Sequence, residues 1–323
     1  MKIAVPDDYQ QLVATLDCYA ELRGHDVRVF QGPAKNADEL VTQLNDAEAV
    51  VLIRERTAMT ADVIARLPRL RHIGQTGRST HHIDVAACTA RGITVSHGTH
   101  ASAHTIAEYT WALILASRRD IADQMQTMRR GEWLPRLGRG LHGKTLGIHG
   151  FGKIGSLVAQ AGKVFGMRVI TWGGDESRRR ALDAGCECVA TKHALYSQSD
   201  VLSLNLRLSE RTRHSVTASD LAAMQPSSLL VNTARAEIIE PGALEAALTA
   251  GRPGYAAVDV YENEPVLSGD HPLLKMNNAL CTPHSAWIEK EMFECYFGEA
   301  FENVVNFARG APTNLVNPSA QQR

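Results

Sequence analysis

Residues 144–155 read KTLGIHGFGKIG and carry the pattern Gly-x-Gly-x-x-Gly from position 150 onward. The apolar residues before this pattern predict a short buried strand, and residues 154–163 predict a helix that begins inside it. A glycine-rich turn between a strand and a helix is typical of a dinucleotide-binding βα unit. A plain βα turn that merely needs glycine is the alternative, and the flanking strand and helix favour the binding site.

Each glycine of this turn has its own physical role. Gly150 permits the tight turn, Gly152 lets the backbone approach a pyrophosphate, and Gly155 lets the helix pack closely on the strand. The helix begins around Lys153 and Ile154, where N–H groups and the positive end of the helix dipole attract phosphates. We therefore expect these residues to bind a dinucleotide cofactor.

Outside this stretch, short apolar runs alternate with amphipathic segments, which is the βαβ pattern of a parallel sheet. In the N-terminal part, strands are predicted at 3–5, 27–30, 49–53, 72–75 and 94–96. Further along, strands are predicted at 145–149, 169–172, 201–206, 229–232, 255–260 and 279–282. Helices are predicted at 37–44, at 61–67 after an N-cap at Thr60, and at about 102–117 and 289–309, while 119–142 break the pattern. The sequence thus predicts an α/β fold of two doubly wound units.

The composition is that of a globular protein with room for two cores: 323 residues, 44% hydrophobic and 21% charged. Its 34 basic and 35 acidic residues leave a net charge of -1, which argues against nucleic acid or an anionic membrane as a partner. No apolar run reaches the roughly 20 residues that span a bilayer, and the start does not resemble a secretory signal. The six cysteines show no metal-binding spacing. We therefore expect a cytoplasmic protein with reduced thiols and no membrane partner.

The end of the second strand of the dinucleotide unit bears on the choice between NAD and NADP. An acidic residue is usual there, because it binds the ribose hydroxyls of NAD. Gly173 holds that position here, and Asp175 is the nearest carboxylate that could reach back. Alternatively, the missing carboxylate and the arginines at 178–180 admit the 2′-phosphate of NADP, although such a run also fits a solvated helix face. Both cofactors stay open, with NAD favoured.

Three polar residues follow successive predicted strands downstream of the glycine-rich turn. Arg235, Glu264 and His284 each lie just past one of these strands. Because the carboxyl ends of parallel strands line the ligand crevice of a doubly wound sheet, all three side chains are expected to face it. Taken one at a time, they fit a helix-cap arginine, a surface glutamate and a core histidine. Together, and in this order, they indicate a catalytic set.

The residues around them resemble the D-isomer-specific 2-hydroxyacid dehydrogenase family over nearly the whole chain. The family's elements Asn-Thr-Ala-Arg, Asp-Val-x-x-x-Glu-Pro and Thr-Pro-His stand here in order at 232–235, 259–265 and 282–284. Carried over position by position, this resemblance implies catalytic roles for the arginine, glutamate and histidine named above.

The resemblance also implies an organisation into domains. A Rossmann nucleotide-binding domain, residues 100–284, would be inserted in a flavodoxin-like substrate domain formed by 1–99 and 285–323. The family usually forms homodimers, and residues 119–142 resemble its dimerisation region, with Trp133 as an anchor. Packing of this arm within one chain is the alternative.

The three residue types suit the chemistry of the family. Reduction of a 2-keto acid needs a hydride at C2 and a proton for the developing alkoxide. Histidine titrates near neutrality, so His284 can donate that proton and accept it in reverse, while Glu264 would orient the ring and favour its protonated form. Arg235, always charged, would bind the carboxylate and polarise the keto oxygen. We expect an NAD(P)-dependent dehydrogenase acting on a small 2-keto or 2-hydroxy acid, of the glyoxylate or hydroxypyruvate kind.

The resemblance further points to a substrate loop at 73–84, whose backbone N–H groups at Arg78 and Ser79 would hold the carboxylate. Ser79 stands where the family usually has glycine, and His81 where it usually has aspartate. These departures bear on the identity of the substrate and not on the reaction class.

Further cofactor-binding residues are implied in the same way. Those expected near the nicotinamide are Thr233, Ala234 and Asp259. Arg207 stands in the loop 205–208, where the family more often has proline, and a basic residue there fits either cofactor.

The histidines at 97, 100 and 104 raise the question of a metal site. His100 and His104 could share one helix face at i, i+4. No carboxylate or cysteine completes an obvious ligand set, however, and hydride transfer needs no metal. We therefore expect no bound metal.

Three alternative functions are known for folds with similar motifs. A D-3-phosphoglycerate dehydrogenase would be favoured by a phosphate contact from Arg54 or Arg56, although both also fit a solvated loop. A formate dehydrogenase is disfavoured, because glutamine is usual at the position of Glu264. A non-catalytic NAD-sensing regulator on the same fold could retain the catalytic set, yet would show negligible turnover.

Overall fold

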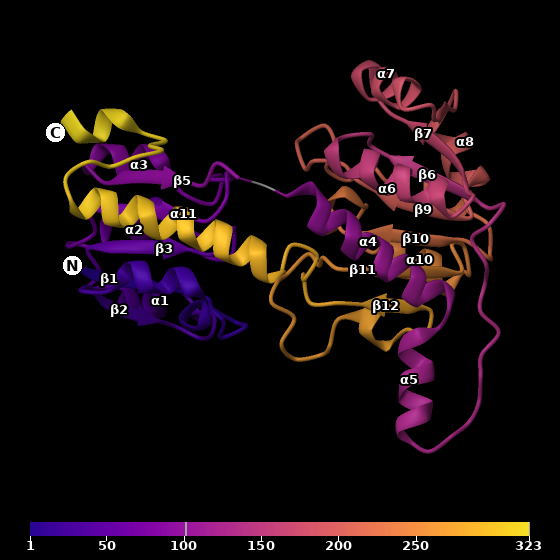
Figure 1. Cartoon of the computed structure of the whole chain (residues 1–323), viewed down its shortest axis with the longest axis horizontal. Helices are drawn as coiled ribbons and strands as arrows, with labels where there is room; N and C mark the ends of the chain where they lie inside the picture. The colour runs from indigo at the N-terminus through magenta and orange to yellow at the C-terminus, as the bar shows by residue number, and fades with distance from the viewer. Residues whose placement is uncertain (101, 323) are drawn as a thin grey trace. The chain divides into compact units, whose positions relative to one another are not determined.

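The chain divides into two compact units, and the computed structural model describes residues 1–100 and 102–322 (Figure 1). Unit 1 comprises Met1–Ala101 and Ile288–Arg323, and unit 2 comprises Ser102–Trp287. Unit 2 is therefore inserted, in sequence, between the two segments of unit 1. Within the described residues, no helix has the length and apolar character needed to cross a membrane.

Unit 1 is built on a parallel five-stranded sheet with the order β2-β1-β3-β4-β5. Its strands are β1 (Lys2–Val5), β2 (Asp26–Val29), β3 (Ala49–Leu52), β4 (His72–Gln75) and β5 (Thr94–His97). The register pairs Ile3 with Ala49 and Val51 with Gly74. Every residue of β3 and β4 is buried, as expected for parallel strands covered on both faces. This strand order is the flavodoxin-like one.

One long helix, α11, covers the centre of this sheet by packing against β3, β4 and β5 (Figure 1). The helical segments of unit 1 are η1 (Val13–Thr15), η2 (Asp17–Leu22), α1 (Ala37–Leu44), α2 (Ala61–Ala65), α3 (Val85–Ala90), α11 (Lys290–Ala308) and η5 (Pro318–Gln322). Gly74 allows the close approach of α11, because a Cβ there would lie 3.1 Å from Val304 Cγ2. The predicted cap of α2 is confirmed: the Thr60 side chain accepts a hydrogen bond from the Val63 N–H.

Unit 2 is built on a parallel seven-stranded sheet with the order β12-β11-β10-β9-β6-β7-β8. Its strands are β6 (Thr145–His149), β7 (Arg168–Trp172), β8 (Glu187–Cys188), β9 (Val201–Leu204), β10 (Leu229–Asn232), β11 (Tyr255–Val258) and β12 (Ala279–Cys281). This is the Rossmann order extended by one strand, and the chain reverses direction across the sheet between β6 and β9. Ligands of such sheets bind at that switch point, outside the carboxyl ends of the strands.

Helices cover both faces of the unit 2 sheet. They are α4 (Ala103–Arg118), α5 (Ile121–Arg129), α6 (Lys153–Val164), α7 (Asp175–Asp183), α8 (Lys192–Gln198), α9 (Ala218–Ala222) and α10 (Ala243–Thr249), with the short η3 (Ala236–Ile238) and η4 (Pro272–Lys275). One apolar cluster contains side chains of α4 and α6, and a second contains side chains of α8, α9 and α10. The Trp111 indole N–H donates to the Val158 carbonyl at 3.1 Å and ties α4 to α6. The predicted α/β fold of two doubly wound units is confirmed.

The structure differs from the sequence prediction mainly in the segment 119–142. This segment contains the helix α5, and residues 132–141 follow it without regular secondary structure. Figure 1 shows α5 and the connecting segment projecting from the sheet of unit 2. The apolar side chains Met125 and Met128 are more than half exposed, at 51% and 55%, so α5 lacks the buried stripe by which an amphipathic helix is recognised.

Candidate active site

The glycine-rich turn lies at the carboxyl end of β6, beside the switch point. Gly150 has φ +97°, which favours glycine, and a Cβ at Gly155 would collide with the Gly150 carbonyl oxygen. A Cβ at Gly152, in contrast, would meet nothing within 4 Å. Two of the glycines are thus required by the fold of the turn, whereas the space beside Gly152 is open for a ligand to approach the backbone.

The helix that follows offers its N-terminus to an anion. α6 begins at Lys153, its cap residue is Gly152, no side chain caps it, and its first turn contains no acidic residue. Backbone N–H groups there and the positive end of the helix dipole suit a pyrophosphate. The residues of this turn therefore fit a dinucleotide cofactor.

An acidic residue that binds the cofactor ribose is usual at the end of β7. In this chain, the side chain of Ser177 lies beside that position and contacts the glycine-rich turn. Ser177 Oγ accepts a hydrogen bond from the Phe151 N–H at 2.8 Å. A Cβ at Gly173 would lie 2.8 Å from this same Oγ, so an aspartate at 173 would require Ser177 to move. Asp175 is exposed and is the first residue of α7. Sequence reasoning missed Ser177, which only its position four residues after Gly173 could have suggested.

The three arginines of α7 make different sets of contacts, although Arg179 and Arg180 share Glu176 as a partner. Arg179 pairs with Glu176 at 2.8 Å on the exposed face, and Arg178 Nη1 lies 3.4 Å from the Val189 carbonyl. Arg180 Nε donates to the Phe151 carbonyl at 3.0 Å. Ser177 and Arg180 therefore both hold Phe151, inside the glycine-rich turn. The solvated helix face that the sequence suggested describes Arg179 fully, whereas exposed Arg180 pairs with Glu176 at 3.2 Å and also contacts the turn.

Glu264 and His284 are in direct contact. His284 Nδ1 lies 2.5 Å from Glu264 Oε2, and the Tyr261 N–H donates to Glu264 Oε1 at 2.8 Å. Both side chains are about one-third exposed, at 31% for His284 and 32% for Glu264. A carboxylate fixed by a backbone N–H thus orients an imidazole that remains accessible to a ligand.

Asp259 holds the segment that carries His284. Its carboxylate accepts hydrogen bonds from the Ser285 N–H at 2.8 Å, the Ala286 N–H at 2.7 Å and the Thr282 hydroxyl at 2.5 Å. Asp259 is fully buried, and burial raises the pKa of its carboxyl although these hydrogen bonds lower it. The residue therefore joins the end of β11 to the loop after β12, on either side of His284.

Arg235 lies in the turn that follows the carboxyl end of β10. Asn232 brackets the turn before it: its Oδ1 accepts from the Ala234 N–H and its Nδ2 donates to the Arg235 carbonyl, both at 3.0 Å. Thr233 is buried, and its hydroxyl lies 2.8 Å from that of Thr110 on α4. Because β10, β11 and β12 are neighbouring parallel strands, the residues that follow them emerge at the same edge of the sheet.

The loop that contains Arg207 lies against the glycine-rich turn. A Cβ at Gly150 would be 2.9 Å from the Asn205 carbonyl oxygen, and the Arg207 carbonyl accepts from the Thr212 hydroxyl at 2.6 Å. Arg207 itself is exposed. All the residues predicted to bind the cofactor therefore follow strands of the unit 2 sheet at their carboxyl ends.

The predicted substrate loop follows β4 in unit 1. Gly77 has φ +79°, Arg78 is exposed, and the Ser79 hydroxyl lies 2.7 Å from His81 Nδ1. Thr76 Oγ1 accepts from the Arg54 N–H at 2.7 Å, which ties this loop to the one after β3.

Arg54 packs against the substrate loop, which sequence reasoning did not foresee. A Cβ at Gly77 would collide with Arg54 Nη1, and the guanidinium lies 5.2 Å from the centre of the Tyr296 ring. The Arg56 guanidinium donates to the Asp7 carbonyl at 2.8 Å and stacks over Tyr9 at 4.6 Å. Arg54 Nε also lies 3.7 Å from Glu55 Oε2, so the carboxyl edge of the unit 1 sheet combines arginines, aromatic rings and carboxylates.

Comparison with known proteins identifies relatives of this chain. Residues 111–286 match the model of the D-isomer specific 2-hydroxyacid dehydrogenase, NAD binding domain. The chain is 38% identical over 294 residues to a glyoxylate reductase of Aeropyrum pernix, covering 88% of this chain and 84% of that protein. It is 35% identical over 295 residues to a D-3-phosphoglycerate dehydrogenase of Methanocaldococcus jannaschii, covering 87% of this chain but 55% of that protein.

A solved structure is similar over the full length. The phosphoglycerate oxidoreductase from Vibrio cholerae O395 has a TM-score of 0.93 and 48% identity, and the match covers 96% of this chain and 100% of that chain. This chain therefore belongs to the D-isomer-specific 2-hydroxyacid dehydrogenase family. It is an oxidoreductase that uses NAD(P).

Proposed function

We propose that the chain reduces a small 2-keto acid to the 2-hydroxy acid, with His284 as the proton donor. The observation that carries this proposal is the 2.5 Å contact between His284 Nδ1 and Glu264. Because Nδ1 is engaged, Nε2 is the nitrogen that would give its proton to the developing alkoxide oxygen. The nicotinamide supplies the hydride to C2 when it is bound. Glu264 would compensate the positive charge that the ring carries before it donates.

Arg235 would bind the substrate carboxylate and polarise the keto oxygen, since a guanidinium offers paired donors in a fixed plane. The backbone N–H groups of Arg78 and Ser79, in the predicted substrate loop, would also offer donors to a substrate carboxylate. Asp259 would act by positioning the His284 segment, and Thr233 and Ala234 by lying near the nicotinamide. A glyoxylate- or hydroxypyruvate-like substrate is supported by the similarity to a glyoxylate reductase.

A phosphorylated 2-hydroxy acid such as D-3-phosphoglycerate is the second candidate substrate. The observation that favours it is Arg54, whose guanidinium lies against Gly77 in the predicted substrate loop. Arginine suits phosphate because its planar fork of donors matches phosphate oxygens. The relatives named for phosphoglycerate support the same possibility.

The test follows nicotinamide absorbance with purified protein, NADH or NADPH, and a panel of glyoxylate, hydroxypyruvate, pyruvate and phosphohydroxypyruvate. We expect turnover of at least one short keto acid, and the ratio of kcat/KM values ranks the two candidate substrates. NADH binding without turnover of any panel member would contradict the proposal and favour a non-catalytic NAD-sensing role.

We further propose a homodimer formed through α5 and the segment after it. Trp133 and Leu137 are 82% and 95% exposed there, which is unusual for large apolar side chains in a monomer. Sedimentation of the parent protein and of Trp133→Glu tests this: we expect a dimer that the charged residue weakens. A monomeric parent would contradict it.

A further inference from the structure

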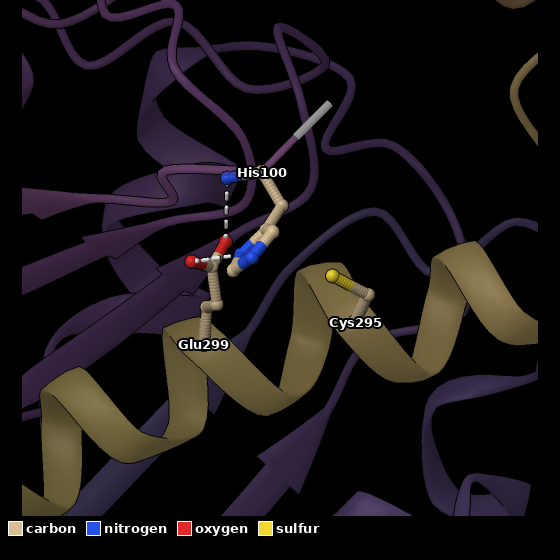
Figure 2. A group of neighbouring side chains, drawn as sticks. All are labelled: His100, Cys295 and Glu299. Carbon is tan, nitrogen blue, oxygen red and sulfur yellow. Dashed lines mark hydrogen bonds and ion pairs between the residues drawn. The ribbon is translucent and has the colours of Figure 1, made fainter. Parts of the chain in front are cut away.

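A histidine, a cysteine and a glutamate meet in unit 1 (Figure 2). Cys295 and Glu299 lie four residues apart on α11, so they share one helix face, and His100 belongs to the segment that follows β5. One potential ligand atom from each residue lies within 4.8 Å of those of the other two. Sequence reasoning dismissed a metal at His100 because it found no carboxylate or cysteine partner. The fold supplies both, and Glu299 lies 199 residues further along the chain.

We propose that His100, Cys295 and Glu299 form a binding site for Zn²⁺. Thiolate sulfur, imidazole nitrogen and carboxylate oxygen are the three ligand types that zinc uses in proteins. A thiolate among them favours zinc over magnesium or calcium, which prefer oxygen ligands only. Three protein ligands leave the fourth tetrahedral position to a water molecule.

The surroundings of Glu299 resemble the outer shell of a metal site. Its carboxylate accepts hydrogen bonds from the Thr99 N–H at 3.0 Å, the Thr99 hydroxyl at 2.5 Å and the His100 N–H at 3.2 Å. Metal-ligating carboxylates are commonly held by such hydrogen bonds, which fix their orientation. Burial raises the pKa of Glu299, but the bonds from Thr99 and His100 outweigh it and lower the pKa overall. The carboxylate is therefore held in a fixed orientation.

Metal binding requires small movements and the loss of protons. Tetrahedral zinc bonds of 2.0–2.3 Å place ligand atoms about 3.5 Å apart, so the three groups must close in slightly. The His100 side chain is 66% exposed and can turn, and it can exchange its 2.6 Å contact with Glu299 for a bond to the ion. Cys295 must lose its thiol proton to solvent.

A second group of possible ligands, in unit 2, provides a matched control. Glu245, Glu262 and His271 also lie within 4.8 Å of one another. His271 Nδ1, however, accepts a hydrogen bond from the Leu273 N–H at 3.3 Å, so its proton lies on Nε2, which contacts Glu262 at 3.1 Å. Both ring nitrogens are engaged and the group has no thiol, which makes it the poorer zinc site.

The experiment titrates the metal-free full-length chain with Zn²⁺ against a chromophoric chelator, and with Co²⁺ followed by absorbance. We expect one tightly bound ion and a near-ultraviolet thiolate-to-cobalt band. Cys295→Ser should remove the band and weaken zinc binding at least about 10-fold, and His100→Asn should weaken it similarly. His271→Asn should change neither.

Thermal unfolding gives an independent measurement, because an ion that binds only the folded state raises Tm. Zn²⁺ should raise the Tm of the parent and of His271→Asn, but not that of Cys295→Ser. Circular dichroism of the metal-free variants checks that they fold, and exposed His100 offers a second variant should Cys295→Ser fail to do so. Absence of stoichiometric binding, or equally tight binding by Cys295→Ser and His100→Asn, would overturn the proposal.

Discussion

Both units place polar side chains at the carboxyl ends of parallel strands, yet they hold them in different ways. In unit 2, buried Asp259 accepts two backbone N–H groups beside His284, and Asn232 brackets the turn before Arg235. In unit 1, Arg54 and Arg56 lie over the rings of Tyr296 and Tyr9. One edge fixes a histidine–glutamate pair through the backbone, whereas the other presents guanidinium groups through side-chain packing. The same architecture thus supports two kinds of chemistry, and the loops decide which.

The largest expected effect tests the acid–base pair of unit 2. His284→Ala should lower kcat about 10³-fold, because the proton donor is lost, while the affinity for NADH stays within a few-fold. The measurement is steady-state kinetics with the best keto acid of the panel. His271→Ala is the matched control, since His271 also contacts a carboxylate in unit 2, at 3.1 Å. Similar losses in the two variants would remove His284 from its proposed role.

The next effect tests the arginines at the carboxyl edge of the unit 1 sheet. Arg54→Gln should raise KM for the keto acid about 10-fold and more for a phosphorylated one, because a positive charge against the substrate loop is removed. kcat at saturation and the KM for NADH should change little. Arg56→Gln should have a smaller effect, since Asp7 and Gln10 bind the Arg56 guanidinium. Equal KM values for parent and Arg54→Gln would show that the edge of unit 1 does not recognise the substrate.

The pH dependence of stability should also differ between the units. Burial lowers the pKa of His72 to about 3 and of His82 to about 4 in unit 1, and of His149 to about 4 in unit 2. These histidines are neutral in the folded chain and charge on unfolding. Their contribution to the free energy of unfolding is therefore complete above about pH 6.5. It is lost as the pH falls toward 4, by at most about 1.4 kcal/mol per pH unit for each histidine.

Urea unfolding between pH 7 and 5 measures this loss. The four tryptophans, at 111, 133, 172 and 287, all belong to unit 2, so their fluorescence follows that unit, while circular dichroism follows both. We expect His72→Gln to flatten the pH dependence seen by circular dichroism and to leave the fluorescence transition unchanged. His149→Gln should flatten the pH dependence of both signals, because circular dichroism also reports on unit 2. An unchanged slope in both variants would mean that other groups govern acid sensitivity.

The smallest expected effect concerns the glycine-rich turn. Arg180→Gln should raise KM for NADH and NADPH alike, about 3- to 10-fold, because one hydrogen bond to the turn is lost. Arg179→Gln should be neutral, since its partner Glu176 is exposed. A selective loss of NADPH would indicate instead that Arg180 contacts the 2′-phosphate.

Local patterns predicted much of this molecule. Features that depend on neighbouring residues could be predicted from the sequence. They include the turn at 150–155, the Thr60 cap and most strand positions. The helix α5 could not, because its apolar side chains face solvent. Contacts between distant segments could not be predicted either. No local pattern around Arg54 indicates its contact with Gly77, and none around His100 indicates its contact with Glu299.

The proposed catalytic residues were partly predictable from local patterns and partly not. Arg235, Glu264 and His284 could be named because each follows a strand and matches a family motif. The residues that position them could not be assigned that way. Asp259 was expected near the nicotinamide, but its hydrogen bonds to the segment around His284 became visible only when β11 and β12 were placed side by side.

The two contacts on Phe151 have a consequence for protein engineering. Ser177 and Arg180 lie close in sequence to Gly173, where the residue that selects NAD or NADP is usual, and in this chain both contact Phe151 of the glycine-rich turn. Substitution of either residue to change coenzyme preference would therefore weaken the binding of both NAD and NADP. A successful switch of preference would therefore need a compensating change that restores support to position 151.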